Sequence, residues 1–418
     1  AHMKQRKWKK QGLAALLALA MVPWGAAAAV DSKTAELAPV SQEYLDYLEL
    51  SPEEQAKTNM PLPFEVNLPD DAGMNQYNKA FPSSYDGRTK GYLGNVKNQG
   101  ETGTCWTMAA TSNLEAYLNR TMPQSSGTSY EFSPRHMEFS NVVFPNDVQN
   151  PDALYRAADM GGNQMISSAY YTRGAGPVDN TGSMKFFSYP HNNVQYPKRA
   201  DLMIDPDFQV TDYQFIWGMT GNTWAQVEQS RLSKINEIKQ SVLDNGSVDL
   251  GIYAGSNAYL SSNNAYYNPN KVMTTNHEVL VVGWDDNYPR ENFNASARPQ
   301  KDGAWIIQNS WGSNILDQGF YYVSYEEYSC YQFNGAIAGA ERKDYDNAYV
   351  LDPAGFNGLL NIGTGAYAAN VFDKEPGTEW LTGVNIATME DCNYAVYVTD
   401  GSLNIRGKSP VATGYADF

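Results

Sequence analysis

The middle of the chain alternates between helical and extended patterns of apolar residues. A helical spacing covers Cys105 to Asn119, and four apolar runs rich in β-branched and aromatic residues follow it. These runs are predicted to be successive strands at Gly246 to Gly255, His277 to Asp286, Gly303 to Gly312 and Gly319 to Glu327. A helical half followed by a β-rich half predicts an α+β fold, with a functional cleft between the halves.

The pattern changes on both sides of this central part. Residues 31–80 are acidic and then proline-rich, with Tyr44, Leu45 and Leu48 at helical spacing, which is typical of a linker or a surface helix. Residues 341–418 contain short apolar runs between Gly, Pro, Asn and Asp turns, a pattern that predicts an all-β sandwich. No clear last strand follows, so we expect the sandwich to be truncated.

Residues 1–30 have the pattern of a secretory signal peptide. Basic residues between Lys4 and Lys10 precede an apolar run from Leu13 to Trp24 and an alanine-rich stretch. The apolar run is too short to span a bilayer comfortably, so we expect cleavage and no membrane span afterwards, rather than an uncleaved anchor. The two residues before Met3 are interpreted as a cloning scar or upstream sequence.

The charge of the chain narrows the classes of partner. The formal net charge is −16, and residues 1–30 carry basic but no acidic side chains, so the remainder is more acidic still. Such a charge disfavours nucleic acid and anionic membranes as partners and favours solubility outside the cell. We therefore expect a secreted protein that is extracellular or associated with a cell surface.

Three cysteines, Cys105, Cys330 and Cys392, are too few for a disulfide-built scaffold. Cys105 opens the predicted helix, where free backbone N–H groups and the helix dipole lower the pKa of a thiol. No second Cys or His lies at ligand spacing from it, so we expect no metal and no cofactor. The local pattern alone leaves three roles open for Cys105, namely nucleophile, packing residue and disulfide partner.

Two more polar residues stand at the ends of predicted strands. His277 precedes the apolar run EVLVVGW, and Asn309 follows the next apolar run, where its carbonyl could hold an imidazole ring. A Cys–His pair with an orienting polar group is the general arrangement of an activated thiol. Gln99 could place its amide beside the backbone N–H of Cys105 as an oxyanion hole, although a single Gln in a loop is more often simply solvated.

Three motifs occur in an order that resembles the papain family of cysteine proteases: NQGETGTCW, NHEVLVVGW and NSWG. The stretch Phe81 to Arg88 is similar to the family's mature N-terminus, and Asp159 to Gly162 is similar to its substrate-backbone loop. The resemblance implies a papain-like two-lobed fold over residues 81–340, with a helical lobe, a β-barrel-like lobe and a cleft between them.

The resemblance also implies catalytic roles. Cys105 would be the nucleophile and His277 the general base and then acid. Asn309 would orient His277, and Trp311 would shield their hydrogen bond from water. Gln99 would help to form the oxyanion hole.

The substrate implied by the resemblance is a peptide or protein. Gly161 and Gly162 would offer main-chain groups to an extended peptide, which needs a close backbone approach and hence no side chain. Met165 would line the S2 pocket, near Asn276 and Gly251.

The sequence departs from the family pattern in three places. Thr102 and Asp159 replace the two cysteines of a common disulfide, which is therefore absent at both ends. The spacing between the cysteine and histidine motifs is long, so we expect an insertion from about Val178 to Arg231 that could wall one side of the cleft. Glu278 should face away from His277, because side chains alternate along a strand.

These observations predict a secreted bacterial cysteine endopeptidase made as a proenzyme, with residues 31–80 as the pro-segment. The last domain resembles the lectin-like sandwiches that some secreted bacterial proteases of this family carry, which implies a cell-wall or glycan ligand. An alternative is a cell-surface or glycan-binding protein with an inactive protease-like domain. Another acyl-transfer enzyme, such as a transpeptidase or a transglutaminase-like protein, can use the same residue types.

Overall fold

The computed structural model describes residues 36–37, 39–65, 80–142, 157–255 and 259–349, together with short stretches between residues 360 and 414. Its main element is an eight-stranded sheet of order β3-β9-β4-β6-β7-β8-β5, with β2 paired to β6. The strands are β2 (Ser84–Asp86), β3 (Phe208–Trp217), β4 (Val248–Ile252), β5 (Ala265–Tyr266), β6 (His277–Asp285), β7 (Ala304–Gln308), β8 (Phe320–Ser324) and β9 (Phe333–Arg342). All pairs are antiparallel except β5 with β8.

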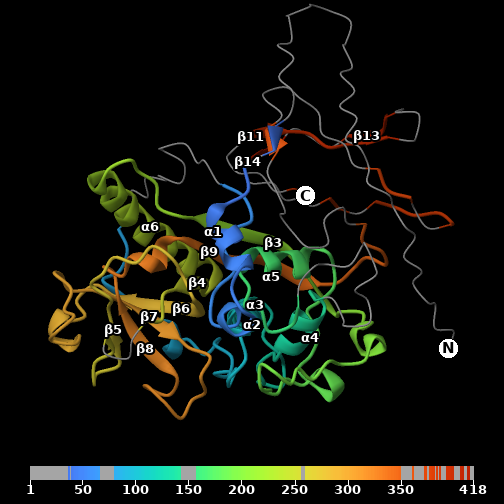
Figure 1. Cartoon of the computed structure of the whole chain (residues 1–418). Coiled ribbons are helices and arrows are strands. Elements are labelled where there is room, and N and C mark those ends of the chain that lie inside the picture. Colours follow the sequence, from blue (N-terminus) through green and yellow to red (C-terminus); the bar gives the residue numbers. More distant parts are fainter. Residues whose placement is uncertain are drawn as a thin grey trace, which may run out of the picture.

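Helices surround this sheet (Figure 1). They are α1 (Gln42–Leu48), α2 (Pro52–Gln55), α3 (Cys105–Thr121), α4 (Pro134–Phe139), α5 (Gln164–Thr172) and α6 (Trp224–Asn245). Short 3₁₀ turns lie at Gly87–Thr89, Gly182–Met184, Arg199–Leu202, Arg290–Asn292 and Tyr328–Tyr331. None of the helices in the described ranges is both long and apolar enough to cross a membrane.

The two long helices α3 and α6 cover opposite faces of the same strands. On β4, Leu250 packs in a core cluster with Ile238 and Val242 of α6. The neighbouring Asp249 points to the other face, where Gln164 of α5 donates to its carboxylate at 3.3 Å. Alternation along one strand thus places an apolar core on one side and buried polar groups on the other, beside α3 and α5.

Local sequence explains where the helices begin and end. The side chain of Asn163 caps α5 by accepting from the N–H groups of Met165 and Ile166. Thr223 caps α6 in the same way, and the helix ends at Gly246, whose φ of 98° favours glycine. The strand β6 is buried over nearly its whole length, as expected for an apolar run in the middle of a sheet.

The predicted α+β class and papain-like arrangement are confirmed, with small shifts of the element ends. The predicted helix from Cys105 extends to Thr121, and the four predicted strands are present as β4, β6, β7 and β8. The pattern did not single out β3 or α6. Among the described residues the sheet has free edges at β3 and β5, so the β-rich lobe is an open sheet rather than a closed barrel.

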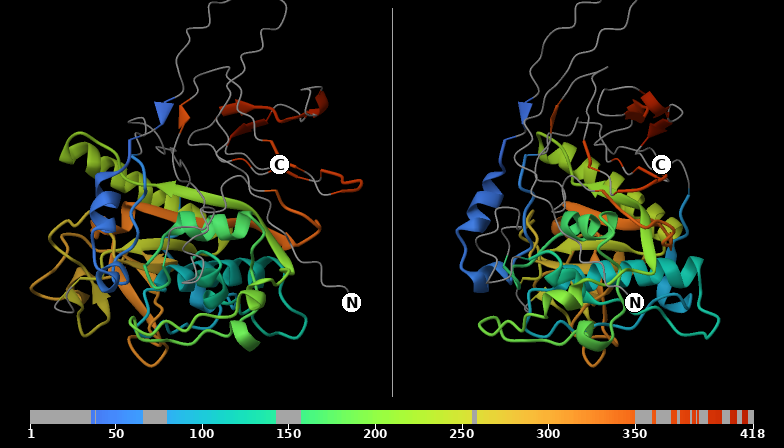
Figure 2. Two further views of the ribbon diagram at one scale, coloured as in Figure 1. Left: turned by 45° about the vertical axis from the view of Figure 1, so that its right-hand side comes forward. Right: turned by 90° about the vertical axis from the view of Figure 1, so that its right-hand side faces the viewer.

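The segment of residues 39–65, called here the covering segment, contains α1 and α2. Figure 1 shows both helices between β5–β8 on one side and α4 and α5 on the other, and Figure 2 shows α1 on the outer surface. The predicted helix around Tyr44 is present, but its buried residue is Tyr47, whereas Leu45 and Leu48 are 43% and 47% exposed. Tyr47 donates a hydrogen bond to the carbonyl of Met160.

Beyond Lys343 the described stretches contain only short strands. They are β10 (Leu360–Asn361), β11 (Cys392–Tyr394), β12 (Tyr397–Thr399), β13 (Ile405–Lys408) and β14 (Ala412–Gly414), and β10 pairs with β1 (Glu36–Leu37). The other two pairs are β11 with β14 and β12 with β13. The predicted signal peptide lies outside the described residues.

Candidate active site

Cys105 is the first residue of α3 and is only 5% exposed. Cys105 and Cys330 are both free thiols, which excludes the disulfide that the sequence left open for Cys105. The Cys330 thiol is buried in the apolar core between α6 and the sheet. The structure therefore places Cys105 at a helix N-terminus, where backbone N–H groups point toward a sulfur.

His277 and Asn309 meet because β6 and β7 are antiparallel neighbours. His277 is the first residue of β6, Asn309 directly follows β7, and Nε2 of His277 lies 2.8 Å from Oδ1 of Asn309. An amide oxygen can only accept, so Nε2 carries the proton and Nδ1 of the neutral ring is left to take one. The ring of Trp311 stacks on His277 at a centroid distance of 5.0 Å, on the solvent side of this pair.

Gln99 is fixed against the end of β7. Its side-chain oxygen accepts from the hydroxyl of Ser310 at 2.6 Å, and its backbone N–H donates to the carbonyl of Ser310 at 2.8 Å. One N–H of the side-chain amide donates to the carbonyl of Thr102 at 2.8 Å. The amide of Gln99 therefore has one further N–H to offer beside the start of α3.

The covering segment reaches these groups through Asn59, which the sequence did not single out. The thiol of Cys105 lies 3.8 Å from Oδ1 of Asn59. The side-chain amide of Asn59 donates to the carbonyl of His277 and the hydroxyl of Thr275, both at 3.2 Å. One asparagine thus bridges the thiol and the strand that carries the imidazole. Sequence patterns do not reveal this contact, because Asn59 lies far from both Cys105 and His277 along the chain.

Gly161 and Gly162 lie against the covering segment as well. The backbone N–H of Met60 donates to the carbonyl of Gly162 at 3.1 Å. A Cβ at Gly161 would lie 2.2 Å from the carbonyl oxygen of Thr58, and one at Gly162 would lie 2.4 Å from the indole of Trp106. The absent side chain at Gly161 therefore lets the covering segment pass at backbone distance, whereas Gly162 makes room for the indole of Trp106.

Met165 is buried in α5 and packs in a cluster with Phe64 of the covering segment and with Trp217 of β3. A side chain at Gly251, which the sequence predicts to lie near Met165, would meet the side chain of Thr275. Asn276 exchanges hydrogen bonds with the backbone of Ala254. The structure thus joins Met165 to an apolar cluster that includes the covering segment.

Burial dominates the electrostatics of this covered site. It raises the pKa of the Cys105 thiol to about 12, and the nearby Glu278 carboxyl adds to the rise, although the backbone N–H groups of Glu278 and Trp106 oppose it. It also lowers the pKa of His277 to about 4, against the stabilising hydrogen bond to Asn309. The expectation of a lowered thiol pKa is therefore wrong for this covered form. The thiol and the imidazole are both uncharged at neutral pH.

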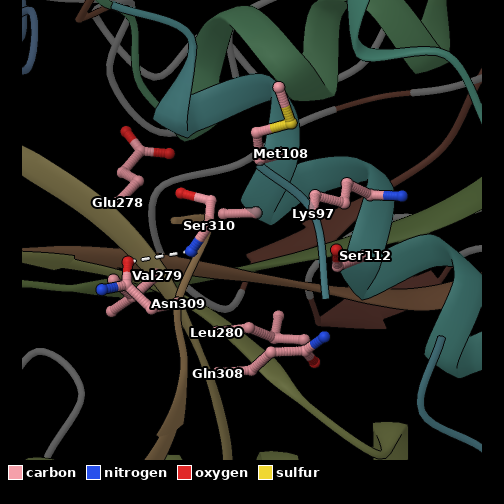
Figure 3. A pocket seen from close by; sticks show the side chains of 10 residues that line it. Lys97, Met108, Ser112, Glu278, Val279, Leu280, Gln308, Asn309 and Ser310 are labelled. Atoms are coloured by element: carbon pink, nitrogen blue, oxygen red, sulfur yellow. Dashed lines mark hydrogen bonds between the residues drawn. The ribbon is translucent and has the colours of Figure 1, made fainter. Parts of the chain in front are cut away.

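Glu278 is completely buried beside α3. It is hydrogen-bonded to Asp249, whose pKa burial raises to about 8. A small pocket of about 10 Å³ lies between α3 and the strands β6 and β7, and Glu278, Asn309 and Ser310 line it together with residues of α3. Figure 3 shows the Glu278 side chain pointing away from the other lining side chains. None of the pocket's lining residues belongs to the covering segment.

The described residues around Cys105 and His277 do not include a set of side chains that could bind a metal ion. Within the ranges that the structure describes, no three His, Cys, Asp or Glu side chains gather as a metal site would require. The chemistry of the described site rests on sulfur, imidazole and amide groups.

Known proteins are similar to this chain in sequence. Bovine cathepsin S (Bos taurus) is 27% identical over 244 residues, which are 58% of this chain and 60% of that protein. Mouse cathepsin S (Mus musculus) is 27% identical over 246 residues, which are 58% of each chain. This chain therefore spans about three fifths of the length of these relatives.

A solved structure extends the likeness. It contains the cysteine protease and lectin-like domains of Cwp84, a surface layer associated protein of Clostridium difficile. It is 27% identical with a TM-score of 0.55, and the match covers 74% of this chain and 62% of that one. The model of the papain family of cysteine proteases matches residues 81–137 and 165–339, which together are more than half of the chain. The protein therefore belongs to the papain family of cysteine proteases.

Proposed function

We propose that this protein is a secreted cysteine endopeptidase, made as a precursor, that uses Cys105 as nucleophile and His277 as base and then acid. The observation that carries this proposal is the 2.8 Å hydrogen bond between His277 and Asn309 beside a free thiol at a helix start, in a chain of the papain family. Peptide bonds are the substrate class because the paired glycines accept an extended backbone.

The reaction proceeds through a thioester. The sulfur of Cys105 attacks the peptide carbonyl carbon while its proton passes to Nδ1 of His277. The backbone N–H of Cys105 and the remaining amide N–H of Gln99 stabilise the resulting oxyanion. The amine product leaves with the proton from His277. A water molecule, deprotonated by His277, then attacks the thioester, releases the acid product and restores the thiol.

Residues 31–80 form the pro-segment in this proposal. The hydrogen bond from Met60 to Gly162 uses the main-chain group that a substrate would need, and Asn59 stands directly against the thiol. A peptide cannot reach Cys105 while these contacts persist. Cleavage or release of the segment therefore starts activity.

Export and a surface location are the remaining parts of the proposal. Residues 1–30 carry the charge and hydrophobicity pattern of a signal peptide. The similar Cwp84 is described as a surface layer associated protein with lectin-like domains. By analogy, residues 341–418 belong to a lectin-like domain that holds a glycan or wall component. The alternative is a surface protein whose protease-like domain is inactive.

Labelling and cleavage on one preparation test the proposal. The secreted protein is freed of residues 31–80 and incubated with a thiol-directed epoxide and a broad peptide panel, beside Cys105→Ala and Cys330→Ala variants. We expect labelling at Cys105 only, and cleavage by the wild type and Cys330→Ala but not by Cys105→Ala. An unlabelled Cys105 together with no cleavage would support the inactive alternative.

A further inference from the structure

The absent disulfide leaves two loops of the cleft without their covalent link. One is the nucleophile loop, defined here as Gln99–Thr104, and the other is the turn that leads into Gly161 and Gly162. The hydroxyl of Thr102, at one end of the missing bridge, bonds inside its own loop to the carbonyl of Gln99 at 2.7 Å and to the Thr104 hydroxyl at 2.6 Å. The bonds of the Thr102 hydroxyl therefore stay within the nucleophile loop and do not link the two loops.

Asp159, at that other end, crosses to the nucleophile loop. Its Oδ1 accepts from the backbone N–H of Gly103 at 2.5 Å, and its Oδ2 accepts from Nδ1 of His191. The carboxyl is nearly fully buried, with the residue 5% exposed, while the His191 ring is partly exposed. A hydrogen bond from a backbone N–H to a carboxylate is charge-assisted, and such bonds are shorter and stronger than those between neutral groups.

Asp159 is held for this contact by its own backbone. Its φ is 64°, a left-handed conformation that Asp tolerates better than most residues. Its N–H donates to Oε1 of Glu138 at 3.0 Å, and the hydroxyl of Tyr189 donates to the same oxygen. The turn is thus fixed by a buried acid on α4, which aims the carboxylate at the nucleophile loop.

The same stretch of chain that supplies His191 also touches the loop directly. The hydroxyl of Ser188 accepts from the N–H of Glu101 at 3.2 Å. A Cβ at Gly100 would lie 2.2 Å from that hydroxyl oxygen. Ser188, Tyr189 and His191 all lie within the predicted insertion between residues 178 and 231. The insertion therefore packs directly on the nucleophile loop.

We propose that Asp159 and His191 are positioning residues of the active site, which replace the family's missing disulfide by a hydrogen-bonded clamp on the nucleophile loop. The inference rests on the proposed function. The clamp fixes the Gly103 amide, two residues from Cys105, and so sets where the oxyanion donors of Gln99 and Cys105 point. With Thr at position 102 and Asp at position 159, neither end of the former bridge carries a cysteine that could exchange with Cys105.

Kinetics test the clamp in the processed enzyme. Asp159→Ala should lower kcat about tenfold or more with little change in KM, since small misplacements of catalytic groups cost such factors. Asp159→Asn, which retains an acceptor for Gly103, should lose less, and His191→Gln should resemble it. The double variant Thr102→Cys, Asp159→Cys, once oxidised, should restore kcat to within about threefold of wild type. Asp205→Ala, which removes a surface ion pair with Lys343, is the matched control and should change nothing.

Amide hydrogen exchange tests the same clamp without any need for activity. In full-length Cys105→Ala protein, adding Asp159→Ala should speed exchange in the peptide spanning 99–104, and the oxidised double-cysteine variant should slow it again. Unchanged exchange and unchanged kcat in Asp159→Ala would overturn the clamp. Inactivity of the wild type with normal exchange effects would instead refute only the proposed function. If Asp159→Ala does not fold, His191→Gln and the double-cysteine variant decide.

Discussion

The two free thiols of the structure are alike in burial and differ in what buries them. Burial raises the pKa of both Cys105 and Cys330. Cys330 lies in the apolar core of the sheet, with the acidic Glu327 as its charged neighbour. Cys105 lies under Asn59 of the covering segment, with two backbone N–H groups directed at its sulfur.

This difference teaches that burial alone does not separate a structural thiol from a catalytic one. The cover of Cys330 is the core itself and can be removed only by unfolding. The cover of Cys105 is a segment attached through a few hydrogen bonds and two apolar clusters, one around Phe64 and one that Met60 joins. When the covering segment leaves, water and the N-terminus of α3 can stabilise the Cys105 thiolate. The covered form does not permit this thiolate.

The largest effect expected from this comparison comes from deleting each sulfur. Cys105→Ala should reduce peptide cleavage by roughly a thousandfold or more, because it removes the proposed nucleophile. Cys330→Ala should lower the melting temperature slightly through a small core cavity and leave kcat within about twofold. Steady-state kinetics and thermal melts on both variants check this. If Cys330→Ala lost more activity than its loss of folded protein explains, the distinction between the two thiols would be wrong.

The second-largest effect concerns His277, the imidazole that is the proposed partner of Cys105. Cys330 has no such partner among the described residues. Asn309→Ala removes the acceptor that holds His277 and should lower kcat by roughly ten- to a hundredfold, since base catalysis needs the ring in place. Asn287→Ala, in an exposed turn after β6, is the control and should have no effect. The measurement is kcat against pH. Wild-type activity in Asn309→Ala would show that His277 needs no orienting partner.

We expect the covering segment to be held less tightly over the site as the pH falls. The pKa of His277 is about 4 in the covered form and about 6.5 for an ordinary histidine. Above pH 6.5 the ring is neutral either way. As the pH falls toward 4 the uncovered ring gains a proton that the covered ring cannot, so the covered form loses up to roughly 3 kcal/mol.

Limited proteolysis of the covering segment in Cys105→Ala protein, at pH 7, 6, 5 and 4, measures this loosening. Cleavage should accelerate with each step down in pH. The variant His277→Gln cannot take up the proton and should show a much flatter profile. Equal acceleration in both proteins would assign the effect to other groups.

The smallest effect is expected at the single side chain over the sulfur. Asn59→Ala loses the hydrogen bonds to His277 and Thr275 and should weaken the cover by about 1 kcal/mol, or roughly fivefold. The rate at which the precursor becomes active reports this change. Asn193→Ala, in an exposed turn, is the control. No change in activation rate would leave the apolar cluster around Phe64 as the main attachment.

The sequence predicts those parts of the site that follow from local patterns. The apolar run after His277 and the one before Asn309 define neighbouring strands, and neighbouring antiparallel strands bring such ends together. The contacts of Asn59 and Asp159 have no local signature, because each joins segments far apart in the chain. The pattern of apolar residues does not predict helix α6, because some of its buried positions are polar. Lys234, for example, is buried as an ion pair with Glu237. The raised thiol pKa follows from a cover that no pattern near Cys105 reveals.

The rates of alkylation of the two thiols, before and after removal of the covering segment, test the central claim most directly. Iodoacetamide is added at pH 7 to the full-length protein and to the processed protein, and the modified cysteines are identified by mass spectrometry. The account predicts slow modification of both thiols in the full-length protein, and an increase of about a hundredfold or more at Cys105 alone after processing. Equal rates at Cys105 in the two forms, or a parallel increase at Cys330, would contradict it.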